Sequence, residues 1–500
     1  MLLAIILLLV IFIITFSFLL GSYNESYWAK RNVKYHGGKN AIATFSEFLF
    51  TSRGIFDIFG DIYKLYPEEP AVATPSLLQP ALFVKHPENI QHVLTDNFKN
   101  FYHRGVEIAK KDKLAQNVLF LNGSRWKLMR QKMTPLFTSA KLKNMHYIID
   151  RCAQDYIGYL KEHVNDKNAN AFETLSVYSC SSLLAPIFGI HSGQSTVTSP
   201  LLNMARNATK PTLKANLKFI LNSLSPKVFQ MLGLSFFGEY EEQFIGAISQ
   251  VIRQRKEENV KKHDFADIAV SLQNAGTMKD ESSGCEIEPT DEVLAAQAFF
   301  FLIAGVDPVT MGIYGTLFEL AKRPDILKQV QQEIDGVFEN NTEIGYDVIG
   351  TMEYLTKVLE ESLRLHPPIS LLSRECMGES ILPVGNIRVS KGTRIDIPIL
   401  AIHHDPKYYP DPDVFDPERF SAENKNSRPN MTFMPFGEGG RLCIGQRFAY
   451  LQMKTGLAHI LRNFTVKVDD VTKKMTYLKS SLIIRPANDI NFTFVPRNKE

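Results

Sequence analysis

The sequence has few cysteines and no marked excess of either charge. Its 500 residues include five cysteines, an odd number at wide spacing, so a disulfide framework is not expected and a reducing compartment is predicted. The five are Cys152, Cys180, Cys285, Cys376 and Cys443. Lysines and arginines number 56 against 53 acidic residues, a net charge of +3. This balance gives no indication of nucleic-acid binding.

Internal repeats, low-complexity tracts and Gly/Ser linkers are also lacking after residue 40. A hydrophobic content of 45% with 22% charged residues is typical of a globular chain that buries a large core. We therefore expect residues 41–500 to fold as one body. The mixed-charge run from Arg253 to Lys262 is expected to be the solvated end of a helix before a surface loop.

The N-terminal segment lacks charge altogether. Residues 1–24 contain no acidic or basic side chain, and the first 20 are almost entirely apolar. A helix of about 20 residues is about 30 Å long and spans a bilayer. A cleaved signal peptide is the alternative, but the segment has no basic start and no clear cleavage site. We expect a membrane anchor at 1–24 and a hinge at 25–40, where four basic residues against one acidic residue predict the cytosolic side.

A long apolar stretch in the middle of the chain predicts a buried helix. Thr290 is a suitable N-cap, and the helical pattern can continue to Lys322, about 32 residues or nearly 50 Å. Pro308 interrupts this pattern because it has no N–H for the Ala304 carbonyl, so the hydrogen-bond ladder should open there. The opening is either a simple kink in a core helix or a groove over a bound cofactor.

A later helix carries Glu361 and Arg364 on one face, three residues apart. On sequence alone such a pair is more often a surface salt bridge that contributes little. The proline-rich segment that follows brings Arg419 as a second partner for Glu361, so one buried carboxylate between two guanidiniums is the other interpretation.

The strongest local signal is the glycine-rich loop FGEGGRLCIG at 436–445, which holds Cys443 just before an amphipathic helix. A dinucleotide-binding loop is excluded because Leu442 occupies the last glycine position. A zinc site is excluded because no other Cys or His lies within four residues of Cys443. A buried structural cysteine is disfavoured by the dense glycines. A helix N-terminus stabilises a thiolate, so Cys443 is predicted to be a metal ligand or a nucleophile, and a haem iron needs only the thiolate.

The sequence motifs taken together resemble those of the cytochrome P450 superfamily. Phe436, Gly439, Arg441, Cys443 and Gly445 match its haem-binding signature FxxGxRxCxG. Glu361 and Arg364 fit its ExxR element, residues 417–420 fit its PERF element, and residues 304–307 fit its oxygen-binding helix. The order of the elements agrees over nearly the whole chain. The pattern is most similar to microsomal xenobiotic-metabolising members, particularly those of insects.

The resemblance implies a mainly α fold with a small β region, and heme b with the Cys443 thiolate as axial ligand. It implies that Glu361, Arg364 and Arg419 form a structural lock and are not catalytic. The other residues implied to contact the haem, including the partners of its propionates, are Arg104, Trp126, Arg130, Ala304, Arg374, Phe436, Arg441 and Gly445. Arginine suits the propionates because it makes bidentate bonds to carboxylates.

The resemblance also implies a monooxygenase that oxidises a lipophilic small molecule with O2 and NADPH. Electrons would come from NADPH-cytochrome P450 reductase, with cytochrome b5 as a further partner, because the sequence has no flavin or nicotinamide motif. The protein would be anchored in the endoplasmic reticulum membrane with its catalytic domain in the cytosol. Basic residues expected to form the docking face are Lys127, Lys132, Lys141, Arg447 and Lys454. Substrate would contact segments near 101–120, 201–212, 366–373 and 476–483.

One position departs from the family pattern. The family usually has threonine directly after the helix acid Asp307, and here that residue is Pro308, with Thr310 two positions later. The missing hydroxyl normally assists proton delivery, so Asp307 and Thr310 become the candidate catalytic residues. The departure keeps open an isomerase, a dehydratase or a peroxide-using oxygenase, and a haem sensor or carrier without turnover.

Overall fold

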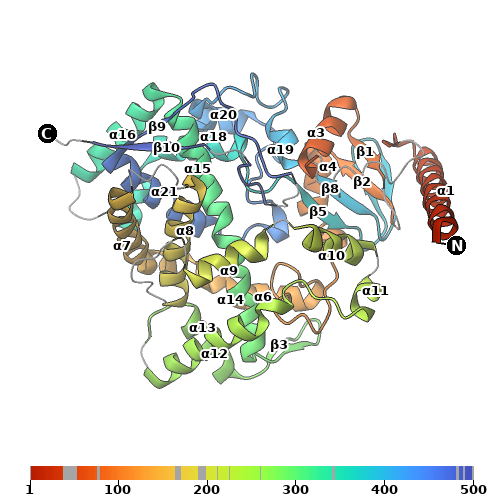
Figure 1. Ribbon diagram of the computed structural model, residues 1–500, viewed down its shortest axis with the longest axis horizontal. Helices are drawn as coiled ribbons and strands as arrows, with labels where there is room; N and C mark the ends of the chain where they lie inside the picture. The colour runs from red at the N-terminus through yellow and green to blue at the C-terminus, as the bar shows by residue number, and fades with distance from the viewer. Residues whose placement is uncertain are drawn as a thin grey trace.

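The computed structural model describes most of the chain and has the mainly helical architecture expected from the sequence (Figure 1). The described residues are 2–37, 53–75, 79–163, 170–189, 197, 199–210, 212–224, 226–258, 261–339, 344–479, 483–487 and 490–497. The N-terminal helix α1 and the C-terminus lie at opposite ends of the molecule in this view.

Helices make up most of the body. Those before the central break are α1 (Leu2–Ala29), α3 (Ile55–Leu65), α4 (Pro87–Gln91), α5 (Phe98–Phe101), α6 (Gly123–Met133), α7 (Ser139–His163), α8 (Ala171–Phe188), α9 (Pro200–Thr209), α10 (Leu213–Leu224), α11 (Pro226–Met231), α12 (Glu241–Glu258), α13 (Phe265–Ala275) and α14 (Asp291–Gly305). After it come α15 (Asp307–Ala321), α16 (Pro324–Glu339), α17 (Tyr346–Gly350), α18 (Glu353–Leu365), α19 (Ile399–His403), α20 (Ala422–Ser427) and α21 (Gln446–Asn463).

The β region is small and lies mostly beside α3 and α4. Its four-stranded sheet has the order β1-β2-β8-β5, in which β2 and β8 are parallel and the other pairs are antiparallel. These strands are β1 (Ala71–Thr74), β2 (Ala81–Val84), β5 (Leu372–Glu375) and β8 (Arg394–Ile397). Three separate antiparallel pairs make up the rest of the β structure: β3 (Met278–Asp280) with β4 (Cys285–Ile287), β6 (Ser380–Leu382) with β7 (Ile387–Val389), and β9 (Phe464–Val468) with β10 (Phe492–Pro496).

The central helix is broken where the sequence predicted. The Thr290 side chain caps α14 by accepting from the Val293 N–H, α14 ends at Gly305, and α15 begins at Asp307 with Pro308 in its first turn. The stretch 291–321 is long and apolar enough to cross a membrane, but 72% of its apolar window is buried inside the described part of the protein. Its burial makes it the core helix of the body, which confirms the prediction.

The N-terminal helix extends beyond the predicted anchor. It continues to Ala29, and Trp28 is fully buried against the β region. Residues 34–36 of the predicted hinge pair with β1, since the His36 N–H donates to the Ala73 carbonyl and the Ala73 N–H donates to the Lys34 carbonyl. Residues 38–40 of the hinge lie outside the described residues.

The mixed-charge run at 253–262 is solvated as predicted, with one exception. Its described residues are exposed except Arg255 in α12, which is only 7% exposed. Its guanidinium makes ion pairs of 2.6 Å with Asp264 and with Asp267. These carboxylates at the start of α13 neutralise the arginine, so the run joins two helices by a buried ionic contact.

Candidate functional site

The loop around Cys443 is held in a tight conformation before α21. The Gly437 N–H donates to the Met434 carbonyl, and the Cys443 N–H donates to the Phe436 carbonyl, each at 3.0 Å. Gly439 has a φ of +69°, and a Cβ there would lie 1.8 Å from the Leu94 carbonyl oxygen. No other residue fits at this position, which explains why the loop requires glycine.

The Cys443 side chain is accessible although it lies deep in the protein. Burial raises the pKa of its thiol. The Gly445 N–H and the guanidiniums of Arg130 and Arg104 act in the opposite direction and favour the thiolate. An accessible sulfur that faces N–H donors and positive charge is suited to ligate a metal.

Arginines that are partly or fully buried gather close to this sulfur, and none has an acidic partner among the described residues. The groups that perturb the pKa of Arg104 are Arg130 and Cys443, and the group that perturbs that of Arg374 is Arg104. Burial and this repulsion lower the pKa of Arg104 to about 10 and that of Arg374 to about 9. The Nε atoms of both are buried without a hydrogen-bond partner among the described residues. The cluster therefore has the electrostatics of a site for an anionic group.

Arg441 is held differently from the other arginines. Its guanidinium makes four hydrogen bonds, to the carbonyls of Tyr102, Val118 and Leu121 and to the Asn122 side chain. It also lies 3.9 Å from the Trp126 ring centroid. Most N–H donors of the Arg441 guanidinium are used by these bonds. The geometry therefore favours a role in bracing the loop before α6, in addition to any contact with a propionate.

Arg104 and Arg374 are brought together by a short backbone pairing. His103 and Glu375 form an antiparallel bridge, in which the Glu375 N–H donates to the His103 carbonyl at 2.8 Å. The His103 ring lies 3.1 Å from the carboxylates of both Glu107 and Glu375. Burial lowers the pKa of His103, but these carboxylates outweigh it and raise the pKa to about 9. The contacts of this ring with both carboxylates hold the bridge that sets the two arginines side by side.

Glu361 forms a buried cluster with two arginines. Arg364 binds it through two bonds of 2.7 and 2.8 Å, and Arg419 Nε lies 3.5 Å from Oε1. The Asp416 N–H also donates to Oε1 at 2.9 Å. Glu361 and Arg364 are fully buried, so the surface salt-bridge interpretation is wrong. This carboxylate–arginine cluster connects α18 to the segment around PERF.

Comparison with known proteins identifies the family of this arrangement. The model of the cytochrome P450 family matches residues 44–494. The chain belongs to the cytochrome P450 family. It is 32% identical to cytochrome P450 6k1 of Blattella germanica, over 94% of this chain and 93% of that protein. It is 30% identical to cytochrome P450 6B2 of Helicoverpa armigera, over 94% of each chain, and 31% identical to cytochrome P450 6a2 of Drosophila melanogaster, over 92% and 93%.

Haem is the cofactor of this P450, and the residues present fit it. The thiol of Cys443 is accessible, and the uncompensated guanidiniums of Arg104 and Arg374 match the charge of two propionates. Arg130 lies at the same loop and donates to the Leu442 carbonyl at 2.8 Å. Ala304 and Gly305 at the end of α14 are only partly buried, whereas residues 301–303 before them are buried. The Phe436 ring packs 5.1 Å from the Tyr450 ring.

The two candidate catalytic residues of this P450 face different surroundings. The Thr310 hydroxyl lies between the Val306 carbonyl at 2.8 Å and the Ser179 hydroxyl at 2.9 Å, and the residue is fully buried. It is thus engaged in packing α15 against α8. Asp307, by contrast, forms an ion pair with Arg485 and lies 2.8 Å from the Thr209 hydroxyl.

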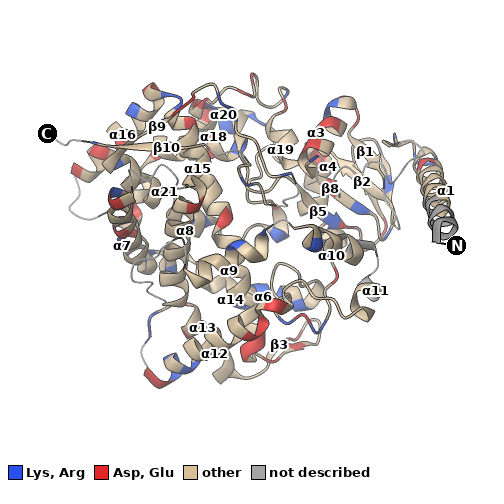
Figure 2. Cartoon of the chain, viewed as in Figure 1, with Lys and Arg blue, Asp and Glu red and all other residues tan. Residues whose placement is uncertain are grey.

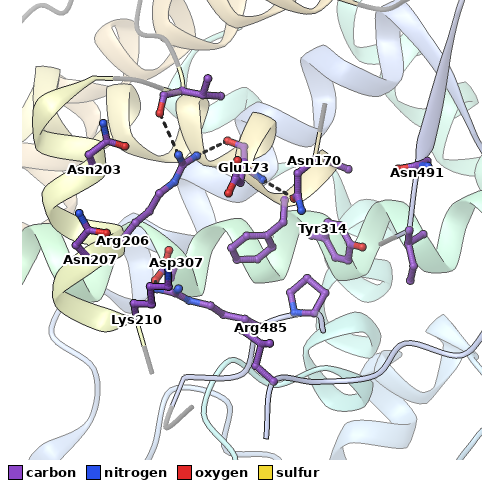
Figure 3. Close-up of a pocket in the computed structure, with 16 residues that line it drawn as sticks. Asn170, Glu173, Asn203, Arg206, Asn207, Lys210, Asp307, Tyr314, Arg485 and Asn491 are labelled. Carbon is purple, nitrogen blue, oxygen red and sulfur yellow. Dashed lines mark hydrogen bonds and ion pairs between the residues drawn. The ribbon is translucent and has the colours of Figure 1, made fainter. Parts of the chain in front are cut away.

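A polar cavity adjoins Asp307 (Figure 3). Its volume is about 680 Å³, and it lies between the start of α8, helices α9 and α15, and the C-terminal segment. Labelled side chains around it include Arg206, Asp307, Tyr314 and Arg485. Sequence reasoning missed Arg485 and Thr209, because no local pattern marks a partner 178 or 98 residues away.

The exposure of the five basic residues predicted to form a docking face differs from one to the next. Lys127 and Arg447 are exposed, and Lys132 and Lys141 are partly exposed. Lys454 is only 6% exposed, and burial lowers its pKa to about 8. It faces the interior from α21, so it is excluded from a surface contact. Figure 2 shows acidic and basic residues interspersed over the body.

Proposed function

We propose that this P450 inserts one oxygen atom of O2 into a lipophilic small molecule, with electrons from NADPH through a separate reductase. The observation that carries the proposal is the accessible Cys443 sulfur beside buried arginines without acidic partners. A bound haem supplies oxygen activation at a thiolate-ligated iron. The protein supplies the ligand, the charge that orients the group, and the surroundings of the reaction.

Each residue near the sulfur has a distinct part in this proposal. Cys443 would provide the thiolate that binds the haem iron, and the Gly445 N–H, which donates to the sulfur, would moderate its electron donation. Arg104, Arg130 and Arg374 hold the propionates. The carboxylate–arginine cluster of Glu361 keeps the scaffold of the loop in place.

Asp307 is the proposed proton-handling residue, on the side of the haem site opposite Cys443. It is 2% exposed and one of its oxygens, Oδ1, has no partner among the described residues. The polar cavity brings solvent close to it, and Pro308 leaves no hydroxyl at the next position. We assign Thr310 a packing role because its hydroxyl is engaged by Val306 and Ser179.

The electron donor is proposed to be NADPH-cytochrome P450 reductase, with cytochrome b5 as a further donor. The sequence has no flavin or nicotinamide motif, so electrons have to come from another protein. Exposed Arg447 lies at the start of α21, four residues after Cys443, and Lys127 lies in α6 with Lys132. A positive surface there suits an acidic partner.

An endoplasmic reticulum location is supported by two exposed apolar surfaces. On α1, large side chains stand in solvent at Ile11, Phe12, Ile14, Phe16, Phe18 and Leu19. A second surface comprises Leu213, Leu217, Val228, Met231 and Leu232 of α10, α11 and the turn after them. Both lie on the same side of the body in Figure 1. We propose that α1 spans the membrane, that the second surface rests on it, and that the body faces the cytosol.

The membrane proposal is tested by deletion of residues 2–24, which retains the buried Trp28. Carbonate-washed membranes should lose most of the protein, while the truncated chain binds haem at full stoichiometry. The substitutions Leu213→Ser and Leu217→Ser, added to the deletion, should weaken the remaining membrane contact. They should release the truncated protein from membranes at low salt. Full retention after both changes would contradict the two-surface account.

The oxidation itself is tested by reconstitution with the reductase, NADPH and ¹⁸O2 on a panel of terpenoids, fatty acids, steroids and plant toxins. We expect NADPH-dependent product that carries one ¹⁸O atom. Product that contains no ¹⁸O would contradict a monooxygenase. The absence of product from every compound, in protein with a normal haem content, would also contradict it.

A second candidate function rests on Pro308. An isomerase, a dehydratase or a peroxide-using oxygenase does not need the proton delivery that the missing hydroxyl assists. Rapid conversion of a lipid hydroperoxide without NADPH or reductase would favour this candidate. A haem carrier without turnover would show neither reaction.

A further inference from the structure

The segment that leads into the cysteine loop is fixed by one histidine. The Met434 N–H donates to Nε2 of His403 at 3.0 Å, and both residues are fully buried. The His403 ring also stacks on Phe433, with centroids 5.4 Å apart and planes 23° apart. His403 ends α19, so a distant helix holds two consecutive residues of the loop entry.

The ring of His403 is itself held by Arg364. Its Nδ1 lies 3.2 Å from the Arg364 carbonyl, and Arg364 Nη1 donates to the His403 carbonyl at 2.9 Å. Because the Met434 N–H can only donate, Nε2 must accept, and the ring proton must sit on Nδ1, where it bonds to Arg364. Burial and the charge of Arg364 lower the pKa of His403 far below its usual value, in keeping with a neutral ring.

From Met434 the contacts continue to the sulfur-bearing residue. The Met434 carbonyl accepts from the Gly437 N–H, and the Phe436 carbonyl accepts from the Cys443 N–H. On the other side, Arg364 is the residue that binds Glu361 through two bonds. A continuous series of buried hydrogen bonds therefore runs from Glu361 through Arg364, His403 and Met434 to the loop.

We infer that His403 is a positioning residue that couples the carboxylate–arginine cluster to the Cys443 loop and thereby sets the geometry of the thiolate. The inference rests on the proposed ligation of haem by Cys443. The acceptor at Nε2 is the necessary feature, because without it the Met434 N–H is buried with no partner. His403 touches neither the sulfur nor the substrate in this account, so it acts only through the backbone of the loop.

Three substitutions separate the hydrogen bond from simple packing. His403→Gln keeps an acceptor near the position of Nε2. His403→Asn keeps a donor near Nδ1 but is too short to reach Met434. His404→Asn is the matched control, because His404 is the next residue and its ring contacts the Leu400 carbonyl of its own turn.

Two measurements report on thiolate ligation of the haem independently of enzyme activity. The first is the fraction of the reduced carbon monoxide complex with the red-shifted Soret band of thiolate ligation. The second is the rate of haem transfer to excess apomyoglobin, measured with the thermal unfolding of each apoprotein. We expect His403→Asn to lose most of the thiolate band and to release haem roughly tenfold faster. His403→Gln should retain most of the band, and His404→Asn should match the parent.

The inference is overturned if His403→Asn keeps the parent spectrum, or if Gln and Asn impair the band equally. If His403→Asn does not accumulate as folded protein, the Gln variant decides: a parent-like band and release rate support the coupling, and loss of both overturns it. A parent protein that itself lacks the thiolate band refutes the ligation by Cys443, an outcome separate from either result with His403.

Discussion

The two sides of the proposed haem site are built in different ways. On the cysteine side, a glycine-bounded loop, the Glu361 cluster and His403 are joined by buried hydrogen bonds of ordinary length. On the side of the helix break, Asp307 meets Arg485 at the edge of a polar cavity, and Pro308 stands where the family has a hydroxyl. The first side is closely hydrogen-bonded and family-like, whereas the second borders a cavity and differs from the family pattern.

This difference suggests that the two sides fail in different ways. A change among fully buried partners strands a charge and should cost folding and haem retention. A change at Asp307 removes no contact to the cysteine loop, so it should alter the reaction while the protein stays loaded. The comparison can therefore be tested with pairs of substitutions, one on each side.

The largest effect is expected from Glu361→Ala. It strands Arg364 and Arg419 as buried charges, a cost of about 3 to 5 kcal/mol. Haem content per folded protein and urea unfolding should both fall steeply. The control Glu286→Ala removes an exposed pair with Lys279 and should cost less than about 1 kcal/mol.

The matching change on the other side is Asp307→Asn, which should leave haem content near that of the parent. Stable, fully loaded Glu361→Ala protein would refute the structural role of the cluster. Loss of haem from Asp307→Asn would show that the two sides do not differ as described.

A smaller effect of opposite sign is expected at Arg374. Its buried guanidinium has no acidic partner and is repelled by Arg104, so Arg374→Met should stabilise the apoprotein by about 1 to 3 kcal/mol. The same change should weaken haem retention, because a propionate loses a cation. Exposed Arg447→Met is the control and should change neither quantity. An apoprotein destabilised by Arg374→Met would contradict an arginine cluster that lacks its anion.

The pH dependence of the free energy of unfolding should reveal the contribution of the charged His103 ring. Its pKa is raised to about 9 from 6.5, so its charged form contributes stability that is complete below pH 6.5 and is lost as the pH rises through 9. Partial exposure of Glu107 screens the contact, and we expect a contribution of about 1 to 2 kcal/mol. His103→Gln should flatten the unfolding free energy between these two pH values. An unchanged slope would exclude this ring as its source.

The smallest effect is expected from Pro308→Thr. Restoring the hydroxyl should raise product formed per NADPH about two- to threefold on simple substrates without a hydroxyl, which is less than 1 kcal/mol in barrier. Thr310→Ala should leave this ratio unchanged, because the Thr310 hydroxyl is engaged by Val306 and Ser179. Tight coupling in the parent that Pro308→Thr does not change would show that the helix break is catalytically ordinary.

Features that depend on residues close together in the chain could be predicted from the sequence, and features that depend on distant residues could not. The Thr290 cap and the break at Pro308 depend on residues a few positions apart, and the sequence predicted both. The glycine loop is likewise a local pattern. The Glu361 cluster required the family resemblance, since spacing alone favoured a surface pair.

The remainder depended on residues far apart in the chain. Arg485 meets Asp307 across 178 residues, and Arg255 is buried by a turn of the chain after α12. Lys454 was predicted to be a surface cation, but it points from α21 into the interior of the protein. No charge pattern reveals which lysine or arginine is buried, because burial is decided by the packing of whole helices.

The central claim is that Cys443 ligates the haem as a thiolate. The most direct measurement is the spectrum of the reduced carbon monoxide complex of the parent, Cys443→Ser and Cys443→His proteins at equal haem content. The account predicts a thiolate-type red-shifted Soret band in the parent and its complete absence from both variants. Survival of that band in either variant would contradict the claim.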